Sequence, residues 1–159
     1  YDGIPLTVDG WEIIEGDLAE NQDIIVTITG AQTDVTNGVE NTATVMIVDQ
    51  NNANVTNNYK ITFEHGTLRV TRRAITIQTN GGEKVYDGTP LTADGISVIG
   101  GALVGVDSID SYTLEGSQTR VGRSENIITD IVIRNQYGDD VTACYAIETV
   151  AGTLKVTAP

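Results

Sequence analysis

The chain contains its own opening sequence a second time. Residues 1–10 and 86–95 are identical at eight of ten positions, and both begin with Tyr-Asp-Gly. Further matches continue at offsets of 85 or 86 residues, up to a closing Gly-Thr-Leu-x-Val-Thr motif at 66–71 and 152–157. A repeat of this length is about the size of a small domain that buries its own core. The sequence therefore predicts two copies of one domain.

The two predicted domains are residues 1–72 and 73–159. In the second copy the segment 74–85 precedes Tyr-Asp-Gly, whereas the first copy starts directly at Tyr1. We therefore expect the first domain to lack its N-terminal strand and to expose a sheet edge. Because the chain begins within its own repeat, we also expect it to be a piece of a longer protein, with secretion and anchoring signals outside this segment.

Several short segments alternate apolar and polar side chains with the period of two that is typical of half-buried strands. These segments are residues 23–30, 42–48, 59–64 and 67–71. The last two are predicted to form a β-hairpin across His65-Gly66. Asn37-Gly38 predicts a further hairpin turn, and Trp11, the only tryptophan, is predicted to anchor the core.

The predicted class is all-β, because no stretch keeps a 3.6-residue apolar period over three turns. Abundant Thr and Asn beside 17 Gly and 3 Pro favour strands joined by tight turns. We expect two tandem repeats of a small Ig-like β-sandwich domain, arranged end to end because Arg72-Arg73 lead into Ala74 without a flexible spacer. A β-grasp-like sheet is the alternative fold, and the missing helix favours the sandwich.

The repeated motifs carry a family resemblance. Tyr-Asp-Gly-x-Pro-Leu-Thr, followed by Asn-Tyr-x-Ile and Gly-Thr-Leu-x-Val-Thr, resembles the YDG and MBG repeat domains of large bacterial surface proteins, and does so twice over nearly the whole chain. The second copy departs from this pattern at Cys144-Tyr145. The resemblance implies an extracellular module at the bacterial cell surface or cell wall, acting as an adhesin stalk or spacer between flanking repeats. The alternative is an adhesive module that binds a host glycoprotein or glycan through an exposed face.

Charge and composition argue against several partners. A net charge of −13 without a cluster of cations is unsuited to nucleic acid or to an anionic membrane surface. No apolar run approaches the roughly 20 residues of a membrane-spanning helix, so no membrane insertion is expected in this segment. The single Cys144 permits no intramolecular disulfide. We expect a monomer with a solvated acidic surface.

The repeat also tests candidate catalytic residues, because a group that is essential to each copy should occur in both. His65 corresponds to Ala151, and Cys144 corresponds to Asn58. A nucleophile–histidine site therefore has no matched residues, and zinc lacks ligands. The sequence predicts no enzyme activity, no catalytic residues and no bound cofactor.

The Tyr-Asp-Gly motif leaves two interpretations open. In the functional one, Tyr1 with Asp2 and Tyr86 with Asp87 contact a ligand, such as a glycan or a protein partner. In the structural one, each Asp bonds backbone N–H groups in a turn and the Gly adopts a positive φ. The strand tyrosines Tyr59 and Tyr145 are predicted to pack half-buried, with their hydroxyls at the surface.

Calcium is the one metal that the sequence leaves open. The carboxylates of Asp9, Glu12, Glu15 and Asp17 lie close together in the chain, and calcium takes six to eight oxygen ligands. Only the first of them recurs, as Asp94, which favours a solvated acidic surface.

One covalent cross-link is a further candidate. Stalk domains of surface proteins sometimes join a Lys side chain to an Asn side chain through an isopeptide bond, with release of ammonia. Among the three lysines, only Lys84 can be paired with an asparagine that recurs in both copies, Asn126, which matches Asn41. Lys84 and Asn126 are therefore the predicted isopeptide pair.

Overall fold

The computed structural model describes all 159 residues and is all-β, with 47% of residues in strands and 4% in helix. The prediction of an all-β class is confirmed. The chain forms two compact units: the first unit is Ile4–Thr71, and the second unit is Arg72–Pro159 together with Tyr1–Gly3. The predicted boundary thus differs at the N-terminus, where three residues pack with the second copy of the repeat. None of the helices is long and apolar enough to cross a membrane.

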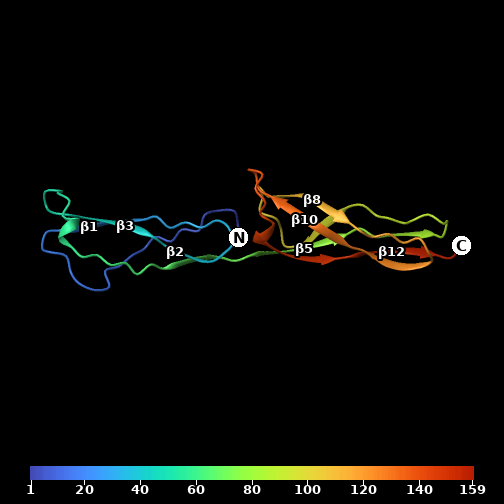
Figure 1. Cartoon of the computed structure of the whole chain (residues 1–159), viewed down its shortest axis with the longest axis horizontal. Helices are drawn as coiled ribbons and strands as arrows, with labels where there is room; N and C mark the ends of the chain where they lie inside the picture. Colours follow the sequence, from blue (N-terminus) through green and yellow to red (C-terminus); the bar gives the residue numbers. More distant parts are fainter. The chain divides into compact units, whose positions relative to one another are not determined.

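The second unit contains eight strands and one short 3-10 helix (Figure 1). They are β5 (Arg73–Thr79), β6 (Gly82–Val85), β7 (Ile96–Gly100), β8 (Ser108–Leu114), β9 (Gly122–Asn126), β10 (Ile128–Arg134), η2 (Thr142–Cys144), β11 (Tyr145–Val150) and β12 (Gly152–Thr157). They pair as three small sheets, in the orders β11-β5-β7, β6-β12-β9 and β10-β8.

Two neighbouring stretches of chain in the second unit pass from one three-stranded sheet to another. One runs from β5 to β6 and the other from β11 to β12, and they stay parallel throughout, since β5 pairs with β11 and β6 with β12. The backbones approach closely at the crossing: a Cβ on Gly81 would lie 2.5 Å from the Thr153 carbonyl oxygen, and one on Gly152 would lie 2.5 Å from that of Thr79. Glycine is therefore required at both positions.

This crossing corrects the predicted hairpin. In the second copy the corresponding strands, β11 and β12, do not pair with each other but join different sheets. In the first copy, residues 59–64 form no strand, and residues 67–70 pair elsewhere. The prediction was wrong because a period of two identifies a strand but not its partner.

The core of the second unit lies under β5 and β12. Five of its apolar side chains are at most 2% exposed: Ile75, Ile77, Ile133, Leu154 and Val156. In β5 the buried residues alternate with more exposed ones, as expected for a strand with one covered face. Each such side chain contributes about 1.5–3 kcal/mol of burial free energy.

The first unit is smaller and has only two side chains buried to this degree, Ile47 and Leu68. Its elements are β1 (Asp23–Ile28), β2 (Thr36–Glu40), β3 (Ala43–Val48), η1 (Thr56–Asn58) and β4 (Thr67–Val70). They form two antiparallel pairs, β1 with β3 and β2 with β4 (Figure 1). No strand of this unit corresponds to β5.

The missing counterpart of β5 explains two irregular segments of the first unit. In the second unit β5 is the central strand between β11 and β7. The first-unit segments that correspond to these two flanking strands, residues 59–64 and 11–15, form no strand. Trp11 is 51% exposed and Ile14 is 62% exposed, so the prediction of a core tryptophan was wrong. Without a central strand, neither flanking segment has a strand to pair with, and neither becomes a strand itself.

Asn37-Gly38 lies inside β2 and is not a hairpin turn. The register of β2 on β4 shifts between Thr36 and Val39, and Gly38 adopts a φ of 147° at this irregularity. A bulge and a primed turn both use positive φ, so the same dipeptide suits either. The prediction of a hairpin turn at Asn37-Gly38 was therefore wrong.

Candidate functional site

A buried side-chain cluster is built around Tyr145, at the start of β11. Its side chain is buried, and the residue is 3% exposed. The hydroxyl donates to Asp107 Oδ2 at 2.6 Å and accepts the Val104 backbone N–H at 3.0 Å. The 3-10 turn η2 ends immediately before Tyr145 and sets its direction. The sequence-based expectation of a surface hydroxyl was wrong for this tyrosine.

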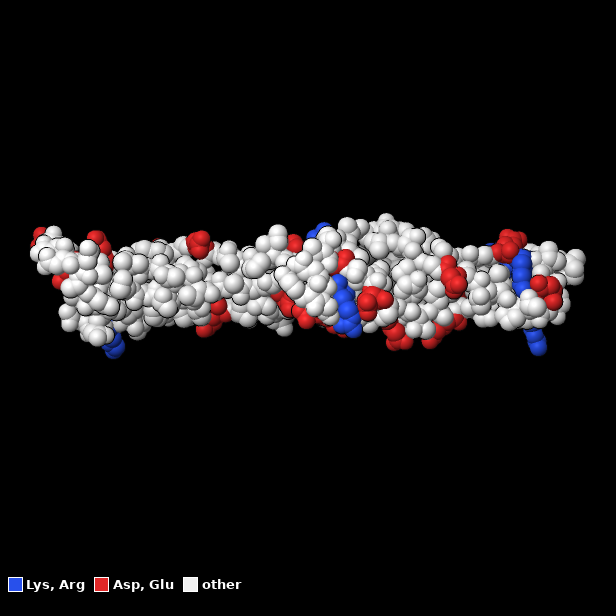
Figure 2. All heavy atoms as spheres, turned by 90° about the horizontal axis from the view of Figure 1, so that it is seen from above, with Lys and Arg blue, Asp and Glu red and all other residues white.

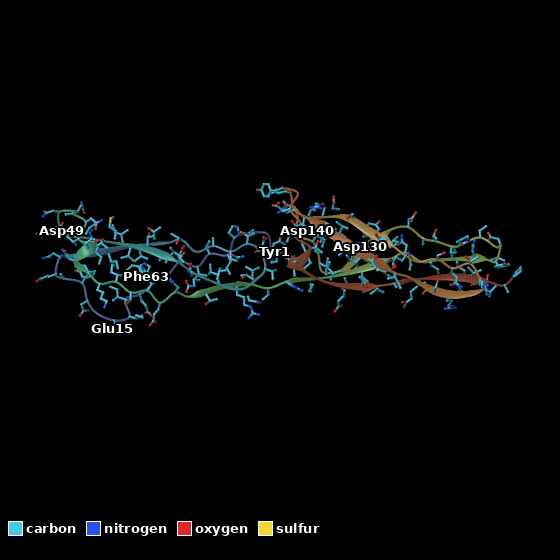
Figure 3. All side chains as sticks on the ribbon, in the orientation of Figure 1. Tyr1, Glu15, Asp49, Phe63, Asp130 and Asp140 are labelled. Carbon is cyan, nitrogen blue, oxygen red and sulfur yellow. The ribbon has the colours of Figure 1, made fainter.

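Tyr1 packs onto the same group. Its ring meets the Tyr145 ring edge to face, with centroids 5.6 Å apart at an interplanar angle of 77°. Its hydroxyl donates to the same Asp107 Oδ2 at 3.1 Å, and its carbonyl oxygen accepts from Arg73 Nη1 at 3.4 Å. Figure 3 shows Tyr1 at the end of this unit that also carries Asp140. An aromatic pair of this kind is worth about 0.5–1.5 kcal/mol beyond its buried area.

We call Tyr1, Arg73, Val104, Asp107 and Tyr145 the Tyr145 cluster. Asp107 is 8% exposed, and its Oδ2 accepts both tyrosine hydroxyls, while its Oδ1 has no hydrogen-bond partner. Burial, followed by the hydrogen bond to Asp107, raises the pKa of Tyr145 to about 12. The same causes raise the pKa of Tyr1 well above its usual range. The cluster holds two phenols in their neutral form and thereby fixes one segment of chain against another.

The raised pKa of Tyr145 has a measurable consequence. Its ordinary value is 10.0 and its value in the fold is about 12, so the folded state favours the neutral phenol. This stabilisation is complete below pH 10 and is lost as the pH rises from 10 through 12. We expect a spectrophotometric titration of the six tyrosines to show a late-ionising fraction, contributed by Tyr1 and Tyr145, that becomes smaller in Tyr145→Phe. Ionisation of all six together near pH 10 in the folded protein would contradict this expectation.

The first unit contains a similar arrangement around Tyr59. The Tyr59 hydroxyl accepts the Ala19 backbone N–H at 2.8 Å and donates to Gln22 Oε1. These three residues precede Tyr145, Val104 and Asp107 by 86, 85 and 85 positions. Gln22 therefore occupies the position of Asp107.

An open hollow of about 510 Å³ lies beside Tyr59. Its lining residues are Asp17, Leu18, Ala19, Gln22, Asn58 and Tyr59. It lies in the part of the first unit next to η1, and Glu15 and Asp49 are labelled at the same end of this unit in Figure 3.

Asn126 has a structural role that the sequence did not predict. It is 0% exposed, and its Nδ2 donates to the backbone oxygens of Asn80 and Ala93, both at 2.9 Å. In the first unit Asn41 Nδ2 donates to the Val8 backbone oxygen at 2.9 Å. Each asparagine thus ties the segment after Tyr-Asp-Gly to a distant part of its own unit. The matched positions of the two asparagines in the repeat were the available signal.

Lys84 bonds within its own motif. Its Nζ donates to Asp87 Oδ1 at 2.7 Å, to the Thr89 carbonyl oxygen at 2.6 Å and to Thr89 Oγ1 at 2.7 Å. Lys84 on β6 and Asn126 on β9 both face β12. Lys84 lies opposite Val156 of that strand, and Asn126 lies opposite Gly152. Four residues of strand correspond to roughly 13 Å. The structure therefore does not bring the predicted isopeptide pair together.

The second Tyr-Asp-Gly motif forms a turn. Asp87 Oδ1 accepts hydrogen bonds from the Lys84 ammonium at 2.7 Å, from the Thr89 hydroxyl at 2.7 Å and from the Thr89 backbone N–H at 2.9 Å. These bonds hold the pKa of Asp87 well below its usual range. Gly88 adopts a φ of 79°. Tyr86 is 45% exposed, whereas Tyr1 packs on Tyr145. The two copies of the proposed ligand-contact pair, Tyr1-Asp2 and Tyr86-Asp87, thus differ in their surroundings.

The sequence missed the acid at the centre of the Tyr145 cluster. Asp107 is one of 22 acidic residues, and nothing in its immediate neighbours marks it as buried. The available signal was its match to Gln22, a second hydrogen-bond acceptor that keeps the same spacing to a recurring tyrosine. The other acidic side chains are dispersed over the face of the molecule drawn in Figure 2.

The structure contains no group of three or more His, Cys, Asp or Glu side chains that could hold a metal ion. The calcium alternative of the sequence therefore gains no candidate ligand set. Comparison with models of protein families, with curated protein sequences and with solved structures found no match.

Proposed function

We propose that this chain is a non-enzymatic, extracellular module of a bacterial surface protein, which acts as an adhesin stalk or spacer. In this proposal the two copies of the repeat are tandem β-sandwich-like domains, extended end to end and flanked by further copies. The proposal rests on one observation. The contacts that recur in both units are all of a kind that builds a scaffold.

Three recurring contacts support it. The first joins Leu6 to Gln32 and, in the second unit, Leu91 to Gln118, each through two backbone hydrogen bonds of 2.8–3.1 Å. The second is the asparagine bridge to a backbone oxygen, and the third is the tyrosine hydroxyl that donates to Gln22 or Asp107. The paired positions include Asn41 with Asn126, Tyr59 with Tyr145, and Gln22 with Asp107. These recurring hydrogen bonds hold backbone segments in place in both units.

The alternative function, adhesion to a host glycoprotein or glycan through Tyr-Asp-Gly, requires both tyrosines to face a ligand. Tyr86 is 45% exposed, but the Tyr1 ring and hydroxyl are engaged by Tyr145 and Asp107. A binding role that each copy shares would leave both rings accessible. This difference favours the stalk over the adhesive module.

Small-angle scattering tests the proposal. We expect the chain to be an elongated particle whose maximum dimension grows in proportion when a second copy of the whole sequence is joined to it. The control is a chain with a Gly/Ser spacer between Thr71 and Arg72, which should sample a wider range of dimensions because such spacers are flexible. A compact globule from the unaltered chain would contradict an extended stalk.

A further inference from the structure

The two tyrosine sites share one design, but only one of them holds a second tyrosine. In the second unit the Tyr1 ring occupies the space beside Tyr145, and its hydroxyl reaches Asp107. In the first unit the corresponding space beside Tyr59 is the hollow of about 510 Å³. The two units therefore differ in whether a second tyrosine fills the space beside the first.

The walls of the two sites correspond position by position. The hollow is lined by Asp17, Leu18, Ala19, Gln22, Asn58 and Tyr59, and these match, in order, Ala102, Leu103, Val104, Asp107, Cys144 and Tyr145. Tyr1 and the residues next to it touch several members of the second set. A Cβ on Gly3 would lie 3.0 Å from Val104 Cγ1, and the Arg73 side chain links the Ala102 and Tyr1 carbonyl oxygens.

The hollow retains the acceptor that a second tyrosine needs. Gln22 Oε1 accepts one hydrogen bond, from the Tyr59 hydroxyl. An amide oxygen has two lone pairs, so it can accept a second hydroxyl, as Asp107 Oδ2 does. Tyr59 is half-buried and lines the hollow, and it holds the position in the repeat of Tyr145, against which Tyr1 packs.

The chain itself carries a tyrosine of the required kind. Tyr86 corresponds to Tyr1 in the repeat, stands in the same Tyr-Asp-Gly motif, and is 45% exposed. The turn that follows it is already fixed by Lys84, Asp87 and Thr89. A pre-organised turn lowers the entropic cost of presenting the ring to a partner.

We propose that the hollow beside Tyr59 is the docking site for Tyr86-Asp87-Gly88 of a second copy of this chain, so that successive copies lock through a tyrosine–tyrosine pair. The Tyr86 ring packs edge to face on Tyr59, its hydroxyl donates to Gln22, and Gly88 lies against Ala19. This inference deepens the proposed function. It rests on one part of that proposal, namely that copies of the repeat follow one another in the chain.

The test uses a double-length chain in which Thr157 is followed by residues 72–85 and then by a second full copy beginning at Tyr1. This order reproduces the junction at Thr71-Arg72 and supplies the second copy with a strand equivalent to β5. Backbone amide NMR signals of Ala19 and Gln22 in the second copy report on the hollow. We expect them to differ from those of the single chain carrying the same added residues 72–85.

Two substitutions in the first copy separate docking from other causes. Tyr86→Ala should abolish the difference in the Ala19 and Gln22 signals, and Tyr86→Phe should retain part of it, because the ring remains and the hydroxyl is lost. The matched control is Tyr137→Ala, which removes a tyrosine that is 80% exposed and lies outside the cluster. Signals that are unaffected by Tyr86→Ala would overturn the proposal.

Other outcomes are equally decisive. If the hollow signals of the single chain shift on addition of a neutral oligosaccharide and those of the double-length chain ignore Tyr86→Ala, the hollow is a glycan site and the docking proposal fails. Small-angle scattering of the same double-length chain keeps the two proposals distinct. An elongated particle in which the hollow is unoccupied supports the stalk and contradicts the docking. A compact particle in which the hollow is occupied supports the docking and contradicts the stalk.

Discussion

Replacing Asn126 by alanine is expected to lower the free energy of unfolding of the second unit by about 2–5 kcal/mol. The side chain is 0% exposed, and its Nδ2 is a hydrogen-bond donor for two backbone oxygens, those of Asn80 and Ala93. Alanine leaves both acceptors without this donor, and each buried polar group that loses its partner costs about 1–3 kcal/mol. Urea denaturation, monitored by circular dichroism of the backbone, measures this loss of stability.

The repeat supplies a matched control for this substitution. Asn41 holds the same position in the first unit but donates only one hydrogen bond, to the Val8 carbonyl oxygen, and is less deeply buried. We therefore expect Asn41→Ala to cost about 1 kcal/mol. Equal effects of Asn41→Ala and Asn126→Ala would show that the second bond and the deeper burial contribute nothing.

An isosteric change adds a dependence on pH. Asn126→Asp removes both donors and places a carboxylate against two carbonyl oxygens in a site without solvent. Burial of this kind raises the pKa of a carboxyl group, so the neutral acid is the form that the fold tolerates. The variant should therefore be least stable above neutral pH and regain stability as the pH falls. Stability that falls with pH as in the unaltered chain would contradict this role.

The sequence predicts strands better than it predicts their partners. The alternation predicted for residues 23–30 and 42–48 corresponds to β1 (Asp23–Ile28) and β3 (Ala43–Val48), because one covered face is enough to produce a period of two. The pairing of β11 with β5 joins residues about 70 positions apart in a parallel register, and no local pattern encodes such a partner. The predicted hairpin failed for this reason.

The Tyr145 cluster shows the same limit for the candidate site. Recurrence in the repeat identifies both the motif tyrosines and the strand tyrosines, but it does not pair a tyrosine of one kind with a tyrosine of the other. The fold combines one of each, since Tyr1 lies on Tyr145 and both donate to Asp107. Spacing within one copy cannot reveal this contact, because Tyr1 belongs to the first copy of the repeat and lies 106 residues from Asp107.

The crossing of the two long stretches in the second unit yields the other large effect. A Cβ on Gly152 would lie 2.5 Å from the Thr79 carbonyl oxygen and 2.6 Å from the Gly81 nitrogen. These are backbone atoms of a neighbouring strand and cannot turn aside as a flexible side chain would. We expect Gly152→Ala to cost about 1–3 kcal/mol or more, because the added methyl group forces β5–β6 and β11–β12 apart.

Gly66 is the matched control for Gly152, since it holds the same position in the first unit and has no atom within 4 Å of its Cβ position. Gly66→Ala should change the free energy of unfolding by no more than about 0.5 kcal/mol, as for an ordinary surface substitution. Adding residues 72–85 before Tyr1 supplies the missing neighbour strand. In that longer chain Gly66→Ala should become as destabilising as Gly152→Ala, because the same backbone crossing then forms at Gly66. An alanine at Gly66 that stays harmless there would show that the first copy does not rebuild the crossing.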